Sequence, residues 1–415
     1  MKFLEELAAR RRFGMKPGLA TIRSLCAALG EPQRQFKAIH VAGTNGKGAV
    51  CAILDAALRE EGLRVGRYTS PHLVKLNERF FLDGAPIDDG TLERVAERVN
   101  SNIRTFERSD ITFFEALTAV AFELYAETKV DYAILECGLG GRLDATNVCE
   151  PALCVITRIG LDHCDWLGDS VEKIAAEKAG IIKPGVPVLF GCNEPSVRAV
   201  VEARAREVGA PFHYAPDLVD ESEIPVKFSL SGSFNRENAI TAIASLKVLA
   251  ARGAQRGAKD FLKGLENVIW PGRFQKVGGF IVDGAHNPPA ARALRAALEG
   301  EGFRRKTLDL ICGFCGDKDV DEVLPILAPL VKKGYAVRTS NPRSLSAEET
   351  AAKMRAVGID ASVSPSLMAA IERSKQSNNQ TIICGSLFLA GEALVELGAY
   401  PWGTPRFDKS ELLKA

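Results

Sequence analysis

Short apolar runs of β-forming residues alternate with segments of helical periodicity along most of this chain. The runs at 36–43, 131–140 and 152–160 lack the polar-apolar alternation of a strand with one face in water. Between the first two runs, residues 47–62 show a helical pattern that ends on a glycine. Strands that are apolar on both faces and separated by helices are typical of a parallel sheet covered on both sides. We therefore predict an α/β fold.

The phosphate-binding character of one loop is the strongest functional signal. The stretch HVAGTNGKGAV follows a predicted strand and opens a predicted helix. Glycines in such a loop let backbone amides approach a phosphate, and the helix N-terminus favours negative charge. We expect nucleotide contacts from the whole loop, namely Gly43, Thr44, Asn45, Gly46, Lys47 and Gly48.

The loop departs from the usual P-loop template at both ends. Val41 stands where the first glycine is expected, and Gly48 stands where a metal-binding hydroxyl is expected. The alternative interpretation is a glycine-rich turn with a solvated lysine. A magnesium ion bound with the nucleotide therefore needs ligands from elsewhere in the chain.

Three polar side chains near the ends of predicted strands are candidates for those ligands. Ser70, Glu136 and His163 each come at or just after an apolar run. Open α/β sheets bind ligands at the carboxyl ends of their strands, and oxygen ligands suit Mg²⁺. Imidazole is a less usual ligand for this ion. Taken singly, these residues could equally be a turn serine, a paired carboxylate and a capping histidine.

The segment 266–279 interrupts the alternation with a proline and several glycines. We place the domain boundary there. The expected organisation is a P-loop nucleotide-binding domain with a parallel sheet over 1–273, followed by a smaller Rossmann-like α/β domain over 274–415. In the second domain the pattern predicts a helix over 319–334 and a strand over 335–340.

Composition excludes several classes of protein. The 415 residues carry a net charge of +1, so no general positive field attracts nucleic acid or an acidic membrane. No apolar run approaches the roughly 20 residues of a membrane span, and the N-terminus lacks a signal-peptide core. We expect a cytoplasmic protein. The ten cysteines, with CGFC at 312–315, are expected to be reduced.

The sequence resembles folylpolyglutamate synthase, including the bifunctional form that is also dihydrofolate synthase, within the Mur-ligase-like ATP-dependent amide ligases. The resemblance spans the chain from about residue 16 to residue 396. The matching stretches are HVAGTNGKG, YTSPHLVKLNER, TFFEALTAVAF, LECGLGGRLDATN, GLDHCDWLG, EKAGIIKPG, WPGRFQ, DGAHNP, NPRSLSAEE and CGSLFLAGEA.

The resemblance implies a metal centre and a modified lysine. The family's magnesium ligands correspond to Ser70, Glu136 and His163, with one or two Mg²⁺ ions bound. Lys178 resembles a lysine that is carbamylated in relatives; the alternative is an ordinary surface lysine. Ala49 departs from the family's usual serine, which affects a secondary phosphate contact rather than the metal site.

The resemblance also implies ATP and folate contacts. Asn238, Arg273, Asp283 and His286 correspond to ATP contacts, although Phe234 and Asn235 replace the family's usual pair. Catalytic roles fall to Lys47, Lys178 and His286. The residues expected to hold the pterin of the acceptor are Thr112, Phe114 and Asp144. On the residues alone, those three are equally a helix cap, a core aromatic and a loop carboxylate.

The activity implied is the ATP-dependent addition of L-glutamate to tetrahydrofolate and to dihydropteroate through an acyl phosphate. A monomer that binds neither nucleic acid nor membrane is expected. Two alternatives remain open: a Mur-type ligase acting on a cell-wall precursor, and a nucleotide-binding regulator without catalysis. A dinucleotide oxidoreductase is disfavoured because the glycine pattern at GLGG is incomplete.

Overall fold

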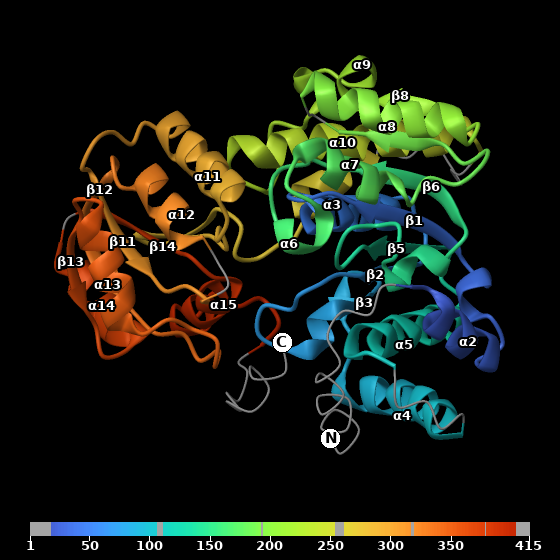
Figure 1. Cartoon of the computed structure of the whole chain (residues 1–415), viewed down its shortest axis with the longest axis horizontal. Helices are drawn as coiled ribbons and strands as arrows, with labels where there is room; N and C mark the ends of the chain where they lie inside the picture. The colour runs from blue at the N-terminus through green and yellow to red at the C-terminus, as the bar shows by residue number, and fades with distance from the viewer. Residues whose placement is uncertain are drawn as a thin grey trace. The chain divides into compact units, whose positions relative to one another are not determined.

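The computed structural model divides into two compact units, each built around one sheet (Figure 1). It describes residues 18–105, 111–191, 194–253, 261–316, 319–377 and 379–403. Unit 1 comprises the residues up to His72, Asn77–Ser229 and Glu237–Val268, and unit 2 comprises Leu73–Leu76, Leu230–Arg236 and the residues from Ile269 onward.

Unit 1 contains an eight-stranded sheet with the order β4-β3-β2-β5-β1-β6-β7-β8. Its strands are β1 (Lys37–Ala42), β2 (Val65–Tyr68), β3 (Phe80–Leu82), β4 (Ala85–Pro86), β5 (Tyr132–Glu136), β6 (Pro151–Ile156), β7 (Val188–Phe190) and β8 (Phe212–Tyr214). The six strands from β2 to β8 in this order are parallel. Strands β3 and β4 extend the sheet in antiparallel fashion at one edge.

The helices of this part of the chain are α2 (Ala20–Ala28), α3 (Lys47–Glu60), α4 (Asp89–Thr105), α5 (Phe113–Glu127), α6 (Cys164–Leu167), α7 (Val171–Ala179), α8 (Pro195–Glu207), α9 (Ala215–Leu218) and α10 (Ser233–Ala251). Short 3₁₀ turns lie at η2 (Pro32–Arg34), η3 (Leu76–Arg79), η4 (Ala145–Val148), η5 (Glu221–Glu223) and η6 (Phe261–Asn267). From β1 the chain passes over the position of β5 to form β2, and it later moves back across the sheet to form β5 between them. Right-handed crossovers therefore set α3 and α5 on opposite faces of the sheet (Figure 1).

Local sequence explains where these elements begin. Helix α5 starts at a capping box, in which Thr112 and Glu115 satisfy each other's backbone amides. Strand β5 is buried at every position and β1 at all but its first, as the apolar runs predicted. The prediction of a parallel α/β sheet is thus confirmed, with the antiparallel β3–β4 edge as an addition that the sequence pattern did not indicate.

A buried ion pair lies inside unit 1, between strand β2 and helix α3. The Nε atom of Arg67 is 3.2 Å from Oδ2 of Asp55, and both side chains are almost fully buried. The guanidinium also lies over the ring of Phe81, 3.7 Å from its centroid. Arg59 pairs with the other carboxylate oxygen of Asp55 at 2.9 Å. Burial of two charges is tolerated only because the partners lie this close.

Unit 2 contains a six-stranded sheet with the order β13-β12-β11-β14-β10-β9, parallel except for β9. Its strands are β9 (Gln275–Val277), β10 (Phe280–Val282), β11 (Leu308–Cys312), β12 (Val331–Ala336), β13 (Asp360–Val363) and β14 (Gln380–Cys384). Its helices are α11 (Pro288–Gly300), α12 (Val320–Leu327), α13 (Ala347–Ala356), α14 (Leu367–Lys375) and α15 (Leu387–Glu396). Two separate cores show that α11, α12 and α13 cover one face of this sheet, while α14 and α15 cover the other.

One predicted helix in unit 2 was too long. The helical pattern over 319–334 covers α12 but also the start of β12, which begins at Val331. Helix α12 ends at Leu327, two residues before Pro329, which has no amide hydrogen to continue the helical hydrogen bonds. Two exposed lysines in the first half of β12 hid the strand signal in the sequence. Strand β13, between helices α13 and α14, was not predicted from the sequence either.

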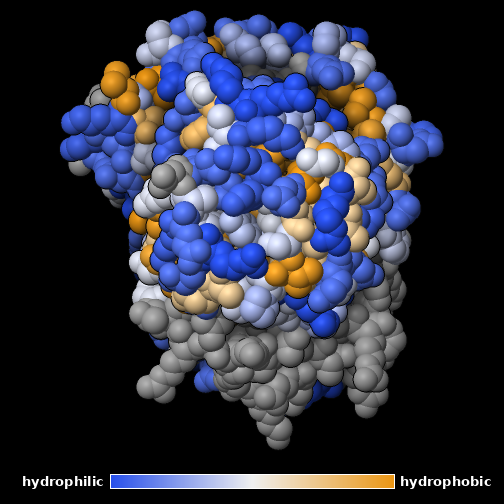
Figure 2. Space-filling view, turned by 90° about the vertical axis from the view of Figure 1, so that its left-hand side faces the viewer, coloured by the Kyte–Doolittle hydropathy of each residue, from blue (hydrophilic) through white to orange (hydrophobic). Residues whose placement is uncertain are grey.

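No helix in the described part of the chain is long and apolar enough to cross a membrane. The face drawn in Figure 2 is mainly hydrophilic, with hydrophobic side chains in small separate groups. All nine cysteines among the described residues are free thiols, as expected, and Cys164 alone of these nine is exposed.

Candidate functional site

The predicted phosphate loop follows the carboxyl end of β1, between two neighbouring strands. Val41 pairs with Glu136 of β5, and Ala42 pairs with Ile156 of β6. The loop stays beside the segment that follows β6, since the amide of Thr44 donates to the carbonyl of Arg158 at 2.8 Å. The ends of three parallel strands therefore meet around the loop, which is where this fold class binds ligands.

Two glycines of the loop have conformations and surroundings that exclude a side chain. Gly43 has a φ of 148°, and a Cβ atom on it would overlap with the hydroxyl of Thr157. Gly46 has a φ of 88°, and a Cβ atom there would overlap with the side-chain amide of Asn238 in α10. The loop is therefore packed against other elements of unit 1 by bare backbone. Asn238 lies beside the loop, and its contact with ATP remains a prediction.

The loop leaves a helix N-terminus and a lysine available for an anion. The N-cap residue of α3 is Gly46, which has no side chain to accept from the first amides of that helix. The Nζ atom of Lys47 donates to the carbonyl of Thr44 at 3.1 Å. The hydroxyl of Thr44 is fastened to Gly160, donating to its carbonyl at 3.0 Å and accepting from its amide at 3.1 Å.

Lys178, in the last turn of α7, lies directly behind the loop. Its Nζ atom donates to the carbonyl oxygen of Gly43 at 2.8 Å. Burial, reinforced by the charge of Lys47, lowers the pKa of Lys178 to about 7. The side chain is 4% exposed, so the alternative of an ordinary surface lysine is excluded. A lysine with this pKa is largely a neutral, nucleophilic amine slightly above neutral pH.

The three predicted metal ligands lie at the strand ends, and two of them are in direct contact. The amide of Ser70 donates to Oε2 of Glu136 at 3.0 Å, and this carboxylate is buried at the end of β5. His163 precedes α6 in a left-handed conformation, with its Nε2 atom 3.9 Å from Asp162. Among the described residues, no three His, Cys, Asp or Glu side chains form a ready metal site. A serine oxygen, a carboxylate and an imidazole fit a divalent ion whose remaining ligands are phosphate oxygens.

The residues predicted to hold a pterin surround the loop after β5. Phe114 packs its ring against the open face of Gly138, and its centroid is 6.0 Å from that of Tyr68. The carboxylate of Asp144 accepts from the amides of Leu139, at 2.9 Å, and Thr146, at 3.0 Å. Burial raises the pKa of Asp144.

Thr112 and Asp144 have structural partners of their own. The Thr112 hydroxyl donates to Glu115 and accepts from its amide in the capping box of α5. Asp144 shapes the turn that leads into η4. The Thr112 hydroxyl can accept one further hydrogen bond, because a hydroxyl oxygen accepts two. The helix-cap and loop-carboxylate interpretations are therefore correct as local descriptions, and the substrate roles remain predictions.

The loop after β5, residues 138–147, is anchored on the C-terminal end of α7. The side-chain amide of Asn147 donates to the carbonyls of Arg142 and Gly180, at 2.9 and 3.2 Å. The ammonium of Lys183 donates to the side-chain and main-chain oxygens of Asn147, at 2.7 and 3.1 Å. These anchors were missed from the sequence, although both lie in stretches that carry the resemblance. These hydrogen bonds fix the predicted acceptor loop relative to helix α7, which carries Lys178.

The remaining predicted ATP contacts lie in unit 2. Asp283 is buried and accepts from the amides of Phe274, at 2.7 Å, and Ala285, at 2.8 Å. Burial raises its pKa, and the nearby Arg273 opposes this. The Nδ1 atom of His286 lies 2.7 Å from the carbonyl of Gly284. Nδ1 therefore carries the hydrogen, and Nε2 of the neutral ring is an acceptor.

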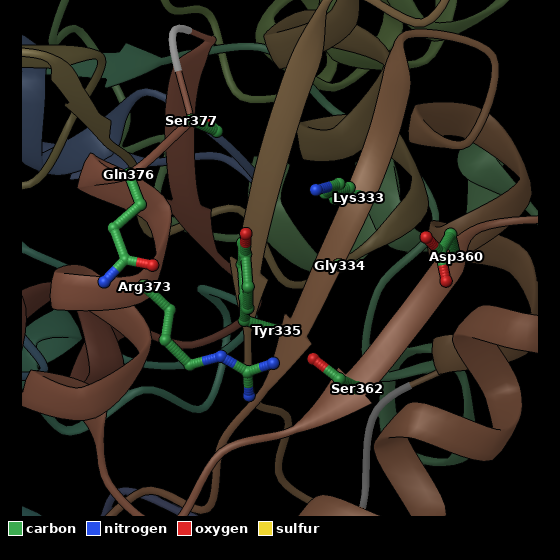
Figure 3. A pocket seen from close by; sticks show the side chains of 8 residues that line it. All are labelled: Lys333, Gly334, Tyr335, Asp360, Ser362, Arg373, Gln376 and Ser377. Atoms are coloured by element: carbon green, nitrogen blue, oxygen red, sulfur yellow. The ribbon is translucent and has the colours of Figure 1, made fainter.

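A polar hollow of about 400 Å³ lies elsewhere in unit 2, between α14 and the strands β12 and β13 (Figure 3). The guanidinium of Arg373 reaches across it towards Ser362 and lies 5.6 Å from the ring centroid of Tyr335. Lys333 and Asp360 lie on the same strands at its rim. None of the predicted site residues lines it.

Two models of the Mur ligases match the chain: the Mur ligase middle domain over residues 41–188, and the glutamate ligase domain over residues 272–387. The chain is also 33% identical, over 411 residues, to the dihydrofolate synthase/folylpolyglutamate synthase of Bacillus subtilis. That alignment covers 92% of this chain and 95% of the relative. The chain belongs to the dihydrofolate synthase/folylpolyglutamate synthase family.

Solved structures of this family share the fold over nearly the whole chain. A Mycobacterium tuberculosis folylpolyglutamate synthase complexed with ADP and AMPPCP has a TM-score of 0.85 and 32% identity, covering 96% of this chain and 98% of that one. Escherichia coli FolC in complex with DHPP and ADP has a TM-score of 0.84 and 28% identity, with coverages of 96% and 98%. The fold prediction of two α/β domains is confirmed.

A third family structure was solved with a metal and an amino acid. It is a bifunctional folylpolyglutamate synthase/dihydrofolate synthase with Mn, AMPPNP and L-glutamate bound, with a TM-score of 0.82 and 29% identity over 95% of this chain and 98% of that one. Membership of this family disfavours both alternatives from the sequence, the cell-wall ligase and the regulator without catalysis.

Proposed function

We propose that this protein is an ATP-dependent ligase that joins L-glutamate to folates, acting on tetrahydrofolate and on dihydropteroate. The observation that carries this is one arrangement within unit 1. The phosphate loop after β1 and the predicted acceptor loop after β5 leave adjacent parallel strands, and both contact the last turn of α7. A nucleotide and a carboxylate acceptor bound at these loops would meet at one edge of the sheet.

The reaction needs no nucleophile from the protein. The acceptor carboxylate attacks the γ-phosphorus of ATP, forming an acyl phosphate and releasing ADP. The amino nitrogen of L-glutamate then attacks the acyl carbon, phosphate leaves, and the nitrogen loses a proton. The protein contributes positioning and charge neutralisation. Lys47 and the amides at the start of α3 are the groups we assign to the β- and γ-phosphates.

We assign a divalent ion, Mg²⁺ in the cell, to Ser70, Glu136 and His163. Support comes from the contact of Ser70 with the buried Glu136 carboxylate at the strand end that borders the phosphate loop. Such an ion would neutralise charge on the phosphate oxygens. In unit 2, Arg273, Asp283 and His286 remain predicted ATP contacts. The domain limits, the cytoplasmic location and the monomeric state remain predictions from the sequence.

We infer that Lys178 is the site of a carbamate. A neutral lysine amine attacks carbon dioxide through its nitrogen and loses one proton, which leaves an anionic carbamate. The lowered pKa of this buried lysine favours that reaction. Mass spectrometry under native conditions in bicarbonate should show the added mass of one CO₂, and the variant Lys178→Met should lack it. Equal addition to both proteins would refute the assignment.

The activity itself is tested by ADP release from the purified protein with Mg-ATP and L-glutamate. Dihydropteroate and tetrahydrofolate are compared as acceptors, with a reaction lacking glutamate as control. Release with both acceptors is expected. Release with tetrahydrofolate alone would limit the protein to polyglutamylation. If neither folate stimulates release while ADP still binds, the proposed function is wrong.

A further inference from the structure

A chain of buried polar groups connects strand β1 to the predicted acceptor loop. The Nε2 atom of His40 lies 2.8 Å from the hydroxyl oxygen of Thr146. That hydroxyl is 2.5 Å from Oδ1 of Asp144. The side chains of His40 and Thr146 have no exposed surface, and Asp144 is 6% exposed. The function described above uses Asp144 alone among these three residues.

The partners determine the direction of each hydrogen bond. An ionised Asp144 carboxylate can only accept, so the Thr146 hydroxyl donates to it. The Thr146 oxygen is then free to accept, and the Nε2 atom of His40 must carry the hydrogen. Burial lowers the pKa of His40 to about 3, so the ring is neutral, and its Nδ1 atom has no hydrogen-bond partner. The thiol of Cys137, 3.1 Å from Nε2, completes the cluster.

The geometry gives each member of the chain a separate effect. Thr146 binds Oδ1 of Asp144 through both its amide and its hydroxyl, which prevents rotation of the carboxylate. Donation by His40 polarises the Thr146 hydroxyl and strengthens its own donation. Oδ2 accepts from the amide of Leu139, the residue after Gly138, against which the Phe114 ring packs.

We propose that His40 and Thr146 are positioning residues for the folate acceptor, holding Asp144 in the orientation that receives the pterin. This inference rests on the proposed function, in which Asp144 accepts a hydrogen bond from the acceptor. It adds that the strand carrying the phosphate loop also fixes the acceptor site, because His40 lies three residues before Gly43.

The test compares matched variants by steady-state ADP release, with dihydropteroate and ATP varied in turn. Thr146→Val and His40→Leu remove the hydrogen bonds, whereas Thr146→Ser and His40→Gln retain the hydroxyl and a donor near the Nε2 position. Asp144→Asn tests the acceptor contact itself. Ser245→Ala removes another fully buried hydroxyl of unit 1, bonded only to the carbonyl of Thr241, and controls for loss of stability.

The expected result is a KM for dihydropteroate raised about tenfold in Thr146→Val and His40→Leu. The KM for ATP should stay within about twofold of wild type, and the two conservative variants should approach wild type in both constants. His40→Leu and Thr146→Val lie on different elements, so failure of one to fold leaves the other as the test.

Three other outcomes separate the inference from the function it rests on. If Asp144→Asn raises the acceptor KM while Thr146→Val and His40→Leu do not, the positioning role is refuted and the function stands. If Thr146→Val and His40→Leu raise the KM for ATP as much as the KM for the acceptor, and Ser245→Ala does the same, the hydrogen bonds from His40 to Asp144 are merely structural. If Asp144→Asn leaves the acceptor KM unchanged in an active enzyme, the pterin contact is wrong and the inference falls with it.

Discussion

The ammonium nitrogen of Lys178 donates to the carbonyl oxygen of Gly43 at 2.8 Å and thereby ties the last turn of α7 to the first residue of the phosphate loop. Gly43 can hold its carbonyl in this direction because its φ of 148° is open to glycine. Helix α7 is therefore fixed directly against the loop that we assign to the nucleotide.

The first prediction concerns stability against pH. The pKa of Lys178 is about 7 in the folded protein and 10.5 when it is unperturbed, so between these values the unfolded chain binds a proton that the folded chain lacks. This contribution to the free energy of unfolding therefore rises with pH, by up to about 1.4 kcal/mol per unit. Urea unfolding at pH 7.5 and 8.5, in buffer free of CO₂, should show this rise in wild type and a smaller one in Lys178→Met.

Lys173→Met is the matched control, because this lysine lies on the same helix but is exposed and paired with Asp169. The variant should keep the pH dependence of wild type. Equal slopes in wild type and Lys178→Met would show that the lysine titrates normally.

The second prediction concerns the backbone of the phosphate loop. Gly46→Ala should weaken ADP binding by at least about tenfold. Residue 46 has a left-handed backbone conformation that disfavours alanine, and the added methyl group would collide with Asn238. Isothermal titration calorimetry measures this directly. Gly279→Ala, where a methyl group meets no atom within 4 Å, should bind ADP as wild type does. Unchanged affinity in Gly46→Ala would remove the loop from the nucleotide site.

The third prediction concerns the divalent ion. Glu136→Gln keeps the size of the side chain but removes its charge, so the Mg²⁺ concentration needed for half-maximal ADP release should rise about tenfold or more. The affinity for ADP without metal should change little. Glu97→Gln, at an exposed ion pair, is the control. A Mg²⁺ requirement that does not change in Glu136→Gln would exclude this carboxylate as a ligand.

The fourth prediction concerns the acceptor. Phe114→Ala should raise the KM for dihydropteroate and for tetrahydrofolate by about tenfold, since stacking and burial of an aromatic ring contribute on the order of 1–2 kcal/mol. The KM for ATP should remain near that of wild type. Phe36→Ala removes a buried ring that contacts Phe122 and Tyr125 of the same helix α5, and it should lower stability without this selective effect. Equal changes in the two variants would argue against a substrate contact.

The fifth prediction concerns the buried ion pair of unit 1. Asp55→Ala leaves the guanidinium of Arg67 buried without its counter-charge, and the free energy of unfolding should fall by about 3–5 kcal/mol. Removal of an exposed partner, as in Glu97→Ala, should cost less than about 1 kcal/mol. Urea denaturation measures both. A small loss in Asp55→Ala would mean that water reaches Arg67.

The sequence was informative where one local pattern determines the structure. The capping box at Thr112, the glycines around α3 and the apolar runs of β1 and β5 each depend on near neighbours in the chain. The start of β12 was mistaken because its exposed lysines do not give a strand pattern. Partners far apart in sequence were not predictable in the same way: the contact of His40 with Thr146 spans 106 residues and that of Lys178 with Gly43 spans 135.

The same distinction holds for the candidate site. Ser70 and Glu136 could be named from strand ends, because parallel strands bring their carboxyl ends to one edge. Lys178 could be named only by resemblance, since nothing in its own helix shows that the side chain is buried under a loop 135 residues away. The second hydrogen-bonding role of Asp144, towards Thr146, was likewise invisible without the turn that precedes η4.

The exposure of Cys164 gives this protein a convenient point of chemical attachment. Cys164 immediately follows His163, and the other eight cysteines in the described part of the chain are buried. In a Cys192→Ser background, a thiol-reactive fluorophore should therefore attach at one position, beside a candidate metal ligand. The emission of that dye would follow the binding of Mg²⁺ and nucleotide in real time, independently of turnover.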